Sequence, residues 1–373
     1  MKIGIVCYPT YGGSGVIATE LGKALSEKEN QVHFITYAVP ARLNFHNNNL
    51  FYHEVGVKNY PLFEFPPYEL SLTSKLVEII QYEKLDILHV HYAIPHASSA
   101  LLAKNILQSF GISIPIITTL HGTDITLIGN DPSCKPVVNF SINQSDGVTA
   151  VSDSLKKDTL NNFDIKVDIE VIPNFIDLNR FKNNIDQQFK KKICKKGEKL
   201  ILHTSNFRKV KRIQDVVNVF CKINKEIPSK LVMIGDGPER ANIESLTRSI
   251  CGLKDVYFLG KMDNVEDILS NGDLFLLTSE KESFGLAALE AMASSVPVVS
   301  TNIGGLPDLI DEGKSGFCCD VGDIDKMTKR SLHILDKNNL INFKESALIK
   351  AEKYSITNIL PLYTNFYKKI LNK

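Results

Sequence analysis

The chain has 373 residues, which is enough for two domains that each bury a hydrophobic core. Its 43 basic and 42 acidic residues give a formal net charge of +1, which excludes a global preference for nucleic acid or anionic membranes. No apolar run approaches the roughly 20 residues of a membrane span. We therefore expect small-molecule partners, with no nucleic acid and no membrane span.

The N-terminal residues begin a strand pattern at once, without the layout of a signal peptide, so we expect a cytoplasmic protein. The seven cysteines are scattered, and only Cys318 and Cys319 are adjacent. No CxxC pair is present, so the sequence indicates neither a disulfide framework nor a zinc site. We expect the cysteines to be reduced thiols.

Short apolar runs alternate with longer amphipathic stretches, a pattern that predicts βα units and mostly parallel sheets. In the first half the candidate strands are residues 3–7, 32–36, 87–90, 114–120 and 148–151. In the second half they are residues 200–203, 231–234, 256–259, 274–277 and 296–300. The pattern thus predicts an α/β protein with two doubly wound sheets.

Residues 172–177 and the lysine-rich stretch 182–199 separate the two series of strands, so we expect a domain junction near residues 170–180. We expect a first domain at residues 1–172 and a second at 173–354. The last segment, 355–373, has a helical pattern and is expected to return to the first domain. Two such domains facing each other would hold a ligand in a cleft at the carboxyl ends of their strands.

Polar residues follow the strands of the first domain. Gly12-Gly13-Ser14-Gly15 opens a helix, where backbone N–H groups can approach an anion, although the motif is neither a GxGxxG fingerprint nor a P-loop. His121 follows a strand and precedes a glycine, so it is a candidate for bonding a sugar hydroxyl or moving a proton. His89 is more typical of a structural residue. A metal site of His89, His91 and His121 is disfavoured, because no carboxylate or cysteine joins them at ligand spacing.

A basic turn follows the first strand of the second domain, at residues 204–212. Arg208 and Lys211 in this turn could neutralise a diphosphate, and a solvated basic cap is the alternative. Two glycine-rich turns, at residues 235–238 and 302–308, follow later strands.

Glu282 and Glu290 flank the start of a helix near Phe284 that follows a buried strand. A helix N-terminus leaves N–H groups unpaired and attracts a phosphate. Spacing alone favours the simpler interpretation, an acidic residue before the helix and a solvated glutamate two turns later. The neighbouring basic turn and strand-end histidine favour the interpretation that Glu282 and Glu290 bind two parts of one ligand.

Together these motifs resemble the retaining glycosyltransferases of family 4 and stand in that family's order. The matching motifs are Gly12–Gly15, His121, the Lys211 turn, Gly235–Pro238, the Glu282/Glu290 pair and Gly304–Pro307. The resemblance implies the GT-B fold, in which two Rossmann-like domains face each other across a cleft. It also implies an acceptor-binding first domain, a UDP-sugar-binding second domain, and no metal or other cofactor.

A closer resemblance is to the branch of this family that serves bacillithiol biosynthesis. It rests on residues 3–9, 12–22, 89–97 and 206–212. The resemblance implies the first step of that pathway, in which N-acetylglucosamine moves from UDP-N-acetylglucosamine to the hydroxyl of L-malate. The anomeric configuration is retained, so the product would be N-acetyl-α-D-glucosaminyl L-malate.

The resemblance also implies roles for individual residues. The expected donor-binding residues are Gly13, Asn206, Arg208, Lys211, Glu282, Phe284, Gly285, Leu286 and Glu290. His121, Lys211 and Glu282 are the expected catalytic residues. Family members usually carry Arg where this chain has Asn206, which leaves open how Asn206 and Arg208 divide their roles. Malate is a dianion, and Ser14, Tyr92 and Thr119 are the hypothesised acceptor contacts.

Other functions stay open at this point. Another family 4 enzyme could transfer a sugar to a lipid or a sugar acceptor, and a UDP-N-acetylglucosamine 2-epimerase would share the two-domain fold. A non-enzymatic nucleotide-sugar sensor is disfavoured, because His121 and Lys211 are both present. The oligomeric state does not follow from the sequence, and a homo-oligomer is compatible with it.

Overall fold

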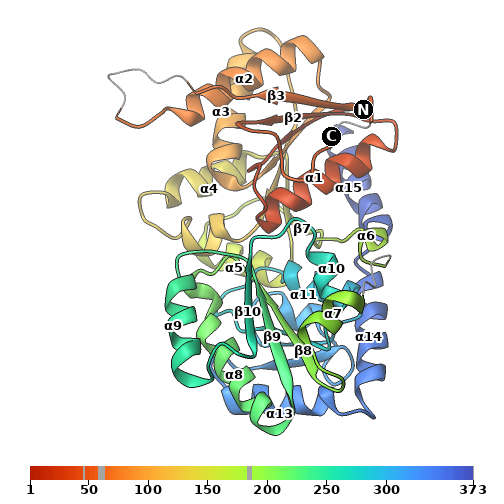
Figure 1. The fold of residues 1–373 in the computed structure, drawn as a ribbon. Helices are drawn as coiled ribbons and strands as arrows, with labels where there is room; N and C mark the ends of the chain where they lie inside the picture. Colours follow the sequence, from red (N-terminus) through yellow and green to blue (C-terminus); the bar gives the residue numbers. More distant parts are fainter. Residues whose placement is uncertain (45–46, 58–63, 183–186, 373) are drawn as a thin grey trace. The chain divides into compact units, whose positions relative to one another are not determined.

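The computed structural model describes residues 1–44, 47–57, 64–182 and 187–372. The chain forms two compact units, one of Met1–Asn174 with Ile356–Lys373 and the other of Phe175–Ser355 (Figure 1). The units therefore divide after Asn174 and after Ser355, whereas we expected divisions after residues 172 and 354. None of the helices in the described ranges combines the length and apolar character that crossing a membrane requires.

Unit 1 contains a seven-stranded parallel sheet with the order β3-β2-β1-β4-β5-β6-β7. The strands are β1 (Lys2–Val6), β2 (Gln31–Thr36), β3 (Leu50–Glu54), β4 (Ile87–His91), β5 (Ile116–Leu120), β6 (Gly147–Ala150) and β7 (Ile169–Val171). The central strands are buried along their whole length, because helices cover both faces of such a sheet.

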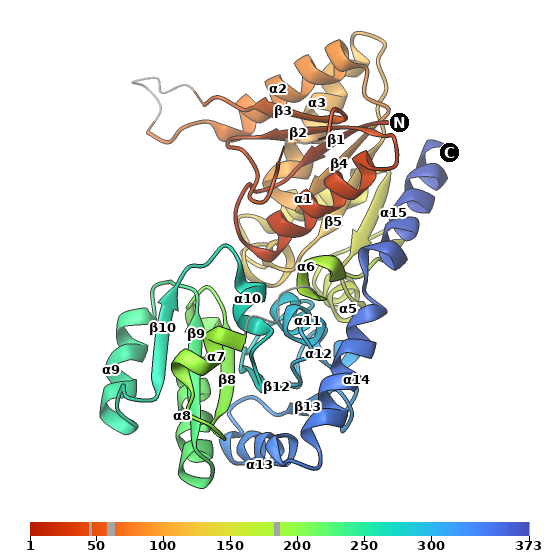
Figure 2. The ribbon, with the colours of Figure 1, turned by 45° about the vertical axis from the view of Figure 1, so that its right-hand side comes forward.

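The helices of unit 1 lie on both faces of its sheet. They are α1 (Gly13–Ser26), α2 (Tyr68–Glu83), α3 (Ser98–Gln108), α4 (Lys135–Gln144), α5 (Asp153–Asn162) and α15 (Ile356–Leu371), with short π-helical turns at Ala93–Ala97 and Thr123–Leu127. Helices α1 and α15 contact each other, as do α2 and α3 (Figure 2). Right-handed crossovers put α1 and α2 on opposite faces, since their connections run in opposite directions along the sheet.

Unit 2 contains a six-stranded parallel sheet with the order β10-β9-β8-β11-β12-β13. The strands are β8 (Lys199–Thr204), β9 (Ser229–Ile234), β10 (Val256–Gly260), β11 (Leu274–Leu277), β12 (Val298–Thr301) and β13 (Gly316–Cys319). Its helices are α6 (Leu178–Lys182), α7 (Gln187–Ile193), α8 (Ile213–Glu226), α9 (Arg240–Ile250), α10 (Val265–Leu269), α11 (Leu286–Ala293), α12 (Leu306–Leu309), α13 (Ile324–Leu335) and α14 (Leu340–Glu352), with a 3-10 turn at Lys209–Lys211.

The core of unit 2 forms where apolar residues of α8 and α13 pack against the sheet. Phe220, Met327 and Leu276 are fully buried in one cluster. The helix α13 begins where the Asp323 side chain accepts the N–H of Lys326, which satisfies one of the unpaired donors at its N-terminus. The expected α/β class with two doubly wound sheets is confirmed.

The expectation that every cysteine is reduced is wrong. Cys221 on α8 and Cys251 at the end of α9 form a disulfide, with their Cα atoms 5.8 Å apart. The two residues are 30 positions apart in the sequence. Their spacing gave no signal because the bond depends on α8 and α9 packing side by side.

Candidate functional site

The predicted donor residues of unit 2 follow two neighbouring strands, β8 and β11. The strand order changes direction between these strands, and such switch points are where open parallel sheets bind ligands. The segments that follow them are tied together: the N–H of Glu280 donates to the oxygen of Val210 at 2.9 Å. The Thr278 hydroxyl reaches the backbone oxygens of Lys211 and Arg212 at 3.1 and 2.9 Å.

Lys211 and Glu282 meet directly. The Lys211 Nζ lies 2.6 Å from the Glu282 Oε2, and the side chains are 19% and 17% exposed. The Ser279 hydroxyl donates to the same carboxylate oxygen at 3.2 Å. An ammonium group and a carboxylate held together at the carboxyl edge of the sheet can bind a phosphate and a hydroxyl side by side.

Gly304 fixes the backbone of Glu282. A Cβ atom at Gly304 would lie 1.6 Å from the Glu282 oxygen, and φ at Gly304 is +55°. The N–H of Gly305 donates to that same oxygen at 3.3 Å. Only glycine allows this approach, so the predicted turn at residues 302–308 supports Glu282.

The helix start that we predicted as an anion-binding position is the N-terminus of α11. Gly285 precedes the helix with φ of +97°, and Leu286 is its first residue. Phe284 is buried and packs edge-on against Tyr354, with ring centroids 5.7 Å apart, which anchors this terminus. Glu290, in the second turn of α11, is buried rather than solvated.

The polar side chains of the basic turn fall into two sets, one exposed and one paired with neighbouring carboxylates. The Asn206 and Arg208 side chains are exposed, and no ion pair of Arg208 occurs within the described ranges. Arg212 instead pairs with Asp215 at 2.7 Å and lies 4.0 Å from Glu280. Arg208 is therefore available to a ligand, whereas Arg212 supports the turn.

In unit 1, Gly13 and Ser14 begin α1 beside the end of β4. The Tyr92 hydroxyl donates to the Ser14 Oγ at 2.8 Å, so two of the predicted acceptor contacts are brought together. Gly15 is needed here because a Cβ atom would lie 2.4 Å from the oxygen of Tyr8. The exposed Gly13 leaves this helix start open.

The placement of Thr119 does not support its expected contact with the acceptor. Thr119 is fully buried, and its hydroxyl lies 2.7 Å from the His89 Nε2 and 2.6 Å from the Thr149 hydroxyl. The Tyr367 hydroxyl lies 2.7 Å from the other ring nitrogen of His89. Thr119 therefore belongs to an internal network that ties β4, β5 and α15, and His89 has the structural role that we expected.

His121 is paired with His91, whose Nδ1 lies 2.8 Å from the His121 Nε2. Burial lowers the pKa of His121 to about 3 and holds the pKa of His91 well below its ordinary value. Both imidazoles are therefore neutral at neutral pH. His121 can donate or accept a hydrogen bond with a ligand, but its ring carries no charge.

Asp124 was not among our candidates, although it organises this edge of unit 1. Its carboxylate accepts the backbone N–H groups of Ala93, Gly122 and His121 at 2.9, 3.0 and 3.3 Å. Burial raises its pKa to about 6. The only sequence signal was its place three residues after a strand-end histidine.

Unit 2 also has a hollow of about 1550 Å³ that is separate from these residues. Lysines such as Lys190, Lys199 and Lys230 line it, together with Asp273. Lys199 begins β8 and Asp273 precedes β11, so the hollow lies at the amino ends of the strands. The predicted donor residues follow the carboxyl ends of the same strands.

Comparisons with known proteins agree with this arrangement. The model described as Glycosyltransferase Family 4 matches residues 11–180, and the model described as Glycosyl transferases group 1 matches residues 184–352. The chain is 48% identical to N-acetyl-alpha-D-glucosaminyl L-malate synthase of Bacillus anthracis, over 100% of this chain and 97% of the relative. It is 28% identical to alpha-monoglucosyldiacylglycerol synthase of Streptococcus pneumoniae, over 85% of this chain and 74% of the relative.

Among solved structures, Anabaena HepE in complex with UDP and glucose matches with a TM-score of 0.82. The match covers 99% of both chains at 18% sequence identity. This likeness confirms the expected GT-B fold.

Proposed function

Because the chain belongs to glycosyltransferase family 4, we propose that it transfers N-acetylglucosamine from UDP-N-acetylglucosamine to the hydroxyl of L-malate. The product is N-acetyl-α-D-glucosaminyl L-malate, the first intermediate of bacillithiol biosynthesis. The observation that carries the proposal is the 48% identity to a synthase of this product along the whole chain.

Lys211 and Arg208 hold the diphosphate of the donor, together with the N-terminus of α11 at Phe284, Gly285 and Leu286. In the free protein Glu282 neutralises Lys211 at 2.6 Å. The diphosphate competes with Glu282 for this ammonium group, which frees the carboxylate to accept hydroxyl groups of the sugar. Negative charge grows on the leaving oxygen as the glycosidic bond breaks, so Lys211 stabilises the transition state more than the ground state.

The other donor contacts use residues with fixed positions. Glu290 accepts the ribose hydroxyls, and its burial makes these hydrogen bonds stronger than they would be in water. His121 bonds the far edge of the sugar as a neutral imidazole, which fits its lowered pKa. Gly13 and Asn206 complete the donor set with backbone and amide groups.

The acceptor hydroxyl attacks on the face from which the diphosphate departs, through a short-lived oxocarbenium-like ion pair. The bond between the anomeric carbon and the phosphate oxygen breaks, and the malate oxygen forms the new bond on the same face. The departing phosphate takes the proton of the malate hydroxyl. No metal or other cofactor takes part in this step.

Malate binds at the start of α1. Because Tyr92 donates to the Ser14 oxygen, the Ser14 hydroxyl hydrogen is free to donate to a malate carboxylate. The N–H group of Gly15 adds a donor at a helix N-terminus, where a dianion is stabilised.

A comparison of acceptors tests the proposal. The protein is incubated with UDP-N-acetylglucosamine and, in parallel, with L-malate, D-malate, diacylglycerol or no acceptor, while UDP release is measured. We expect UDP release that depends on L-malate. Release with diacylglycerol alone would favour a lipid acceptor, and UDP-N-acetylmannosamine formed without an acceptor would favour an epimerase; either result would overturn the malate proposal.

A further inference from the structure

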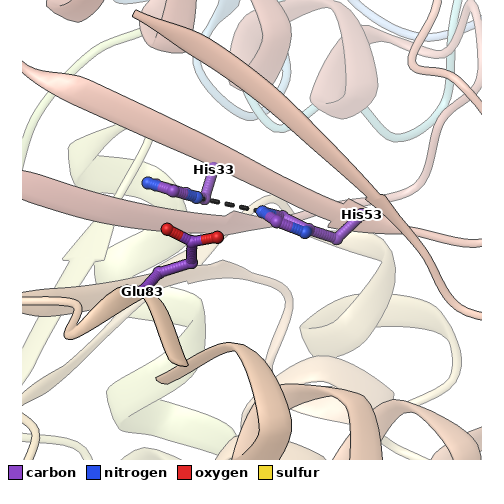
Figure 3. Close-up of side chains that lie close together, drawn as sticks. All are labelled: His33, His53 and Glu83. Carbon is purple, nitrogen blue, oxygen red and sulfur yellow. Dashed lines mark hydrogen bonds between the residues drawn. The ribbon is translucent and has the colours of Figure 1, made fainter. Parts of the chain in front are cut away.

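A cluster of metal-ligand side chains lies at the edge of the unit 1 sheet, apart from the residues proposed for sugar transfer. His33 is on β2, His53 is on the edge strand β3, and Glu83 is the last residue of α2 (Figure 3). The Nζ of Lys2, at the start of β1, donates to the backbone oxygen of Glu83 at 2.8 Å. The Glu83 end of the cluster therefore lies near the amino end of β1, whereas Ser14 follows the carboxyl end of β1.

We propose that His33, His53 and Glu83 bind a divalent transition-metal ion of the zinc type. One potential ligand atom of each side chain lies within 4.8 Å of the others. Figure 3 shows the carboxylate of Glu83 directed toward the two rings. Two imidazole nitrogens and one carboxylate oxygen form a common zinc donor set, in which water takes the fourth position.

The sheet places the two histidines on the same face. Ile35 pairs with His53 and His33 pairs with Phe51, so the histidines are diagonal neighbours across β2 and β3. The His33 ring stacks on Phe51 with a centroid distance of 4.6 Å and is fully buried. This packing fixes one ligand before an ion arrives, which lowers the entropy cost of binding.

The distance between the ring nitrogens requires only a small adjustment. The His33 Nδ1 lies 2.9 Å from the His53 Nε2. Two nitrogens bound to one tetrahedral zinc ion at ~2.0–2.1 Å would be roughly 3.4 Å apart, so the rings need to separate by about half an ångström. The proton between these nitrogens moves to another ring nitrogen when both bind the ion, so binding requires a tautomer change.

The Glu83 carboxylate is available in the resting protein. Among the described residues, no hydrogen-bond donor engages the Glu83 carboxylate. Burial lowers the pKa of His33 to about 4, and the pKa of His53 also lies below its ordinary value, so both rings are neutral. The positive charge of Lys2 disfavours a bound cation here. The charge of Lys75 is neutralised by Glu78, whose Oε1 lies 2.9 Å from the Lys75 Nζ.

The bound ion would join the edge strand β3 to α2. It takes no part in glycosyl transfer, and this inference stands independently of the acceptor. No metal site was expected from the sequence, and His33, His53 and Glu83 are too far apart in the chain to form a recognisable ligand spacing.

The test uses the full-length protein after removal of metal with a chelator. Co²⁺ is titrated as a spectroscopic probe, and Zn²⁺ affinity is measured by competition with a chromophoric chelator. The wild type should bind one equivalent and show the visible bands of four-coordinate Co²⁺ with nitrogen and oxygen ligands. Zn²⁺ should also raise the melting temperature.

Two variants remove a ligand, and one matched variant keeps all three. His53→Ala and Glu83→Gln should weaken Zn²⁺ binding more than about 100-fold, since even outer-shell partners of a metal contribute 10–100-fold. Glu69→Gln removes the same charge from the first turn of the same helix and should bind Zn²⁺ like the wild type. Full Zn²⁺ binding by folded His53→Ala and Glu83→Gln, or cobalt bands typical of cysteine ligands, would overturn the proposal.

Discussion

Replacing Lys211 with alanine should lower turnover sharply while leaving the protein folded. A fixed donor at a developing negative charge contributes about 10²–10³ in kcat, or about 2.7–4 kcal/mol. Lys211 is such a donor in our mechanism, and its 2.6 Å contact with Glu282 shows that its Nζ is already positioned. We therefore expect a loss of turnover in that range.

The same substitution affects stability through Glu282. Without Lys211, the carboxylate keeps the Ser279 hydroxyl as its partner at 3.2 Å. Because Glu282 is 17% exposed, the loss should be about 1–2 kcal/mol rather than the full cost of a buried unpaired charge. That is well below the roughly 5–15 kcal/mol by which domains are stable, so the variant should stay folded.

The assay measures kcat for UDP release with L-malate, alongside the free energy of unfolding. The double variant Lys211→Ala/Glu282→Gln removes the unpaired carboxylate and should recover stability but not turnover. Lys225→Ala changes an exposed lysine near the far end of α8 and should behave like the wild type. Unchanged turnover in folded Lys211→Ala would refute the diphosphate role.

Glu290→Ala should raise the KM for the UDP-sugar more than it lowers kcat; an unchanged KM in steady-state kinetics would contradict the ribose contact. Gly304→Ala should lower the free energy of unfolding by about 1–3 kcal/mol, because its Cβ would lie 1.6 Å from the Glu282 oxygen; denaturant titration measures this, and wild-type stability would disprove the constraint. Acidification from pH 7 to 5 should destabilise the protein, because the unfolded chain protonates His91 and His121 near pH 6.5 while the fold keeps them neutral. For His121 this amounts to about 2 kcal/mol at pH 5, and unfolding free energies that do not change from pH 7 to 5 would exclude it.

Most of the strands that were predicted from sequence are buried along most or all of their length. Residues 274–277 were predicted to the residue, because a parallel strand covered on both faces is a continuous apolar run. The strands β3, β7 and β13 were missed. The polar residues of β3 at a sheet edge and the three-residue length of β7 give no comparable pattern.

The candidate site could also be predicted only in part from the sequence. The strand-end positions of His121, Lys211 and Glu282 follow from the order of motifs in the chain. The contact between Lys211 and Glu282 does not, because it joins residues 71 positions apart. Thr119 shows a further limit: its place near a strand end was clear, whereas the direction of its side chain depends on His89 and Thr149 in neighbouring strands.

The most direct test of the proposed function analyses the product formed from UDP-N-acetylglucosamine and isotopically labelled L-malate. Mass spectrometry should detect one N-acetylglucosamine joined to one labelled malate, with an equal amount of UDP released. Nuclear magnetic resonance should show an α linkage to the malate hydroxyl. A β linkage would contradict the retaining mechanism, and no labelled adduct despite UDP release would contradict the transfer to malate.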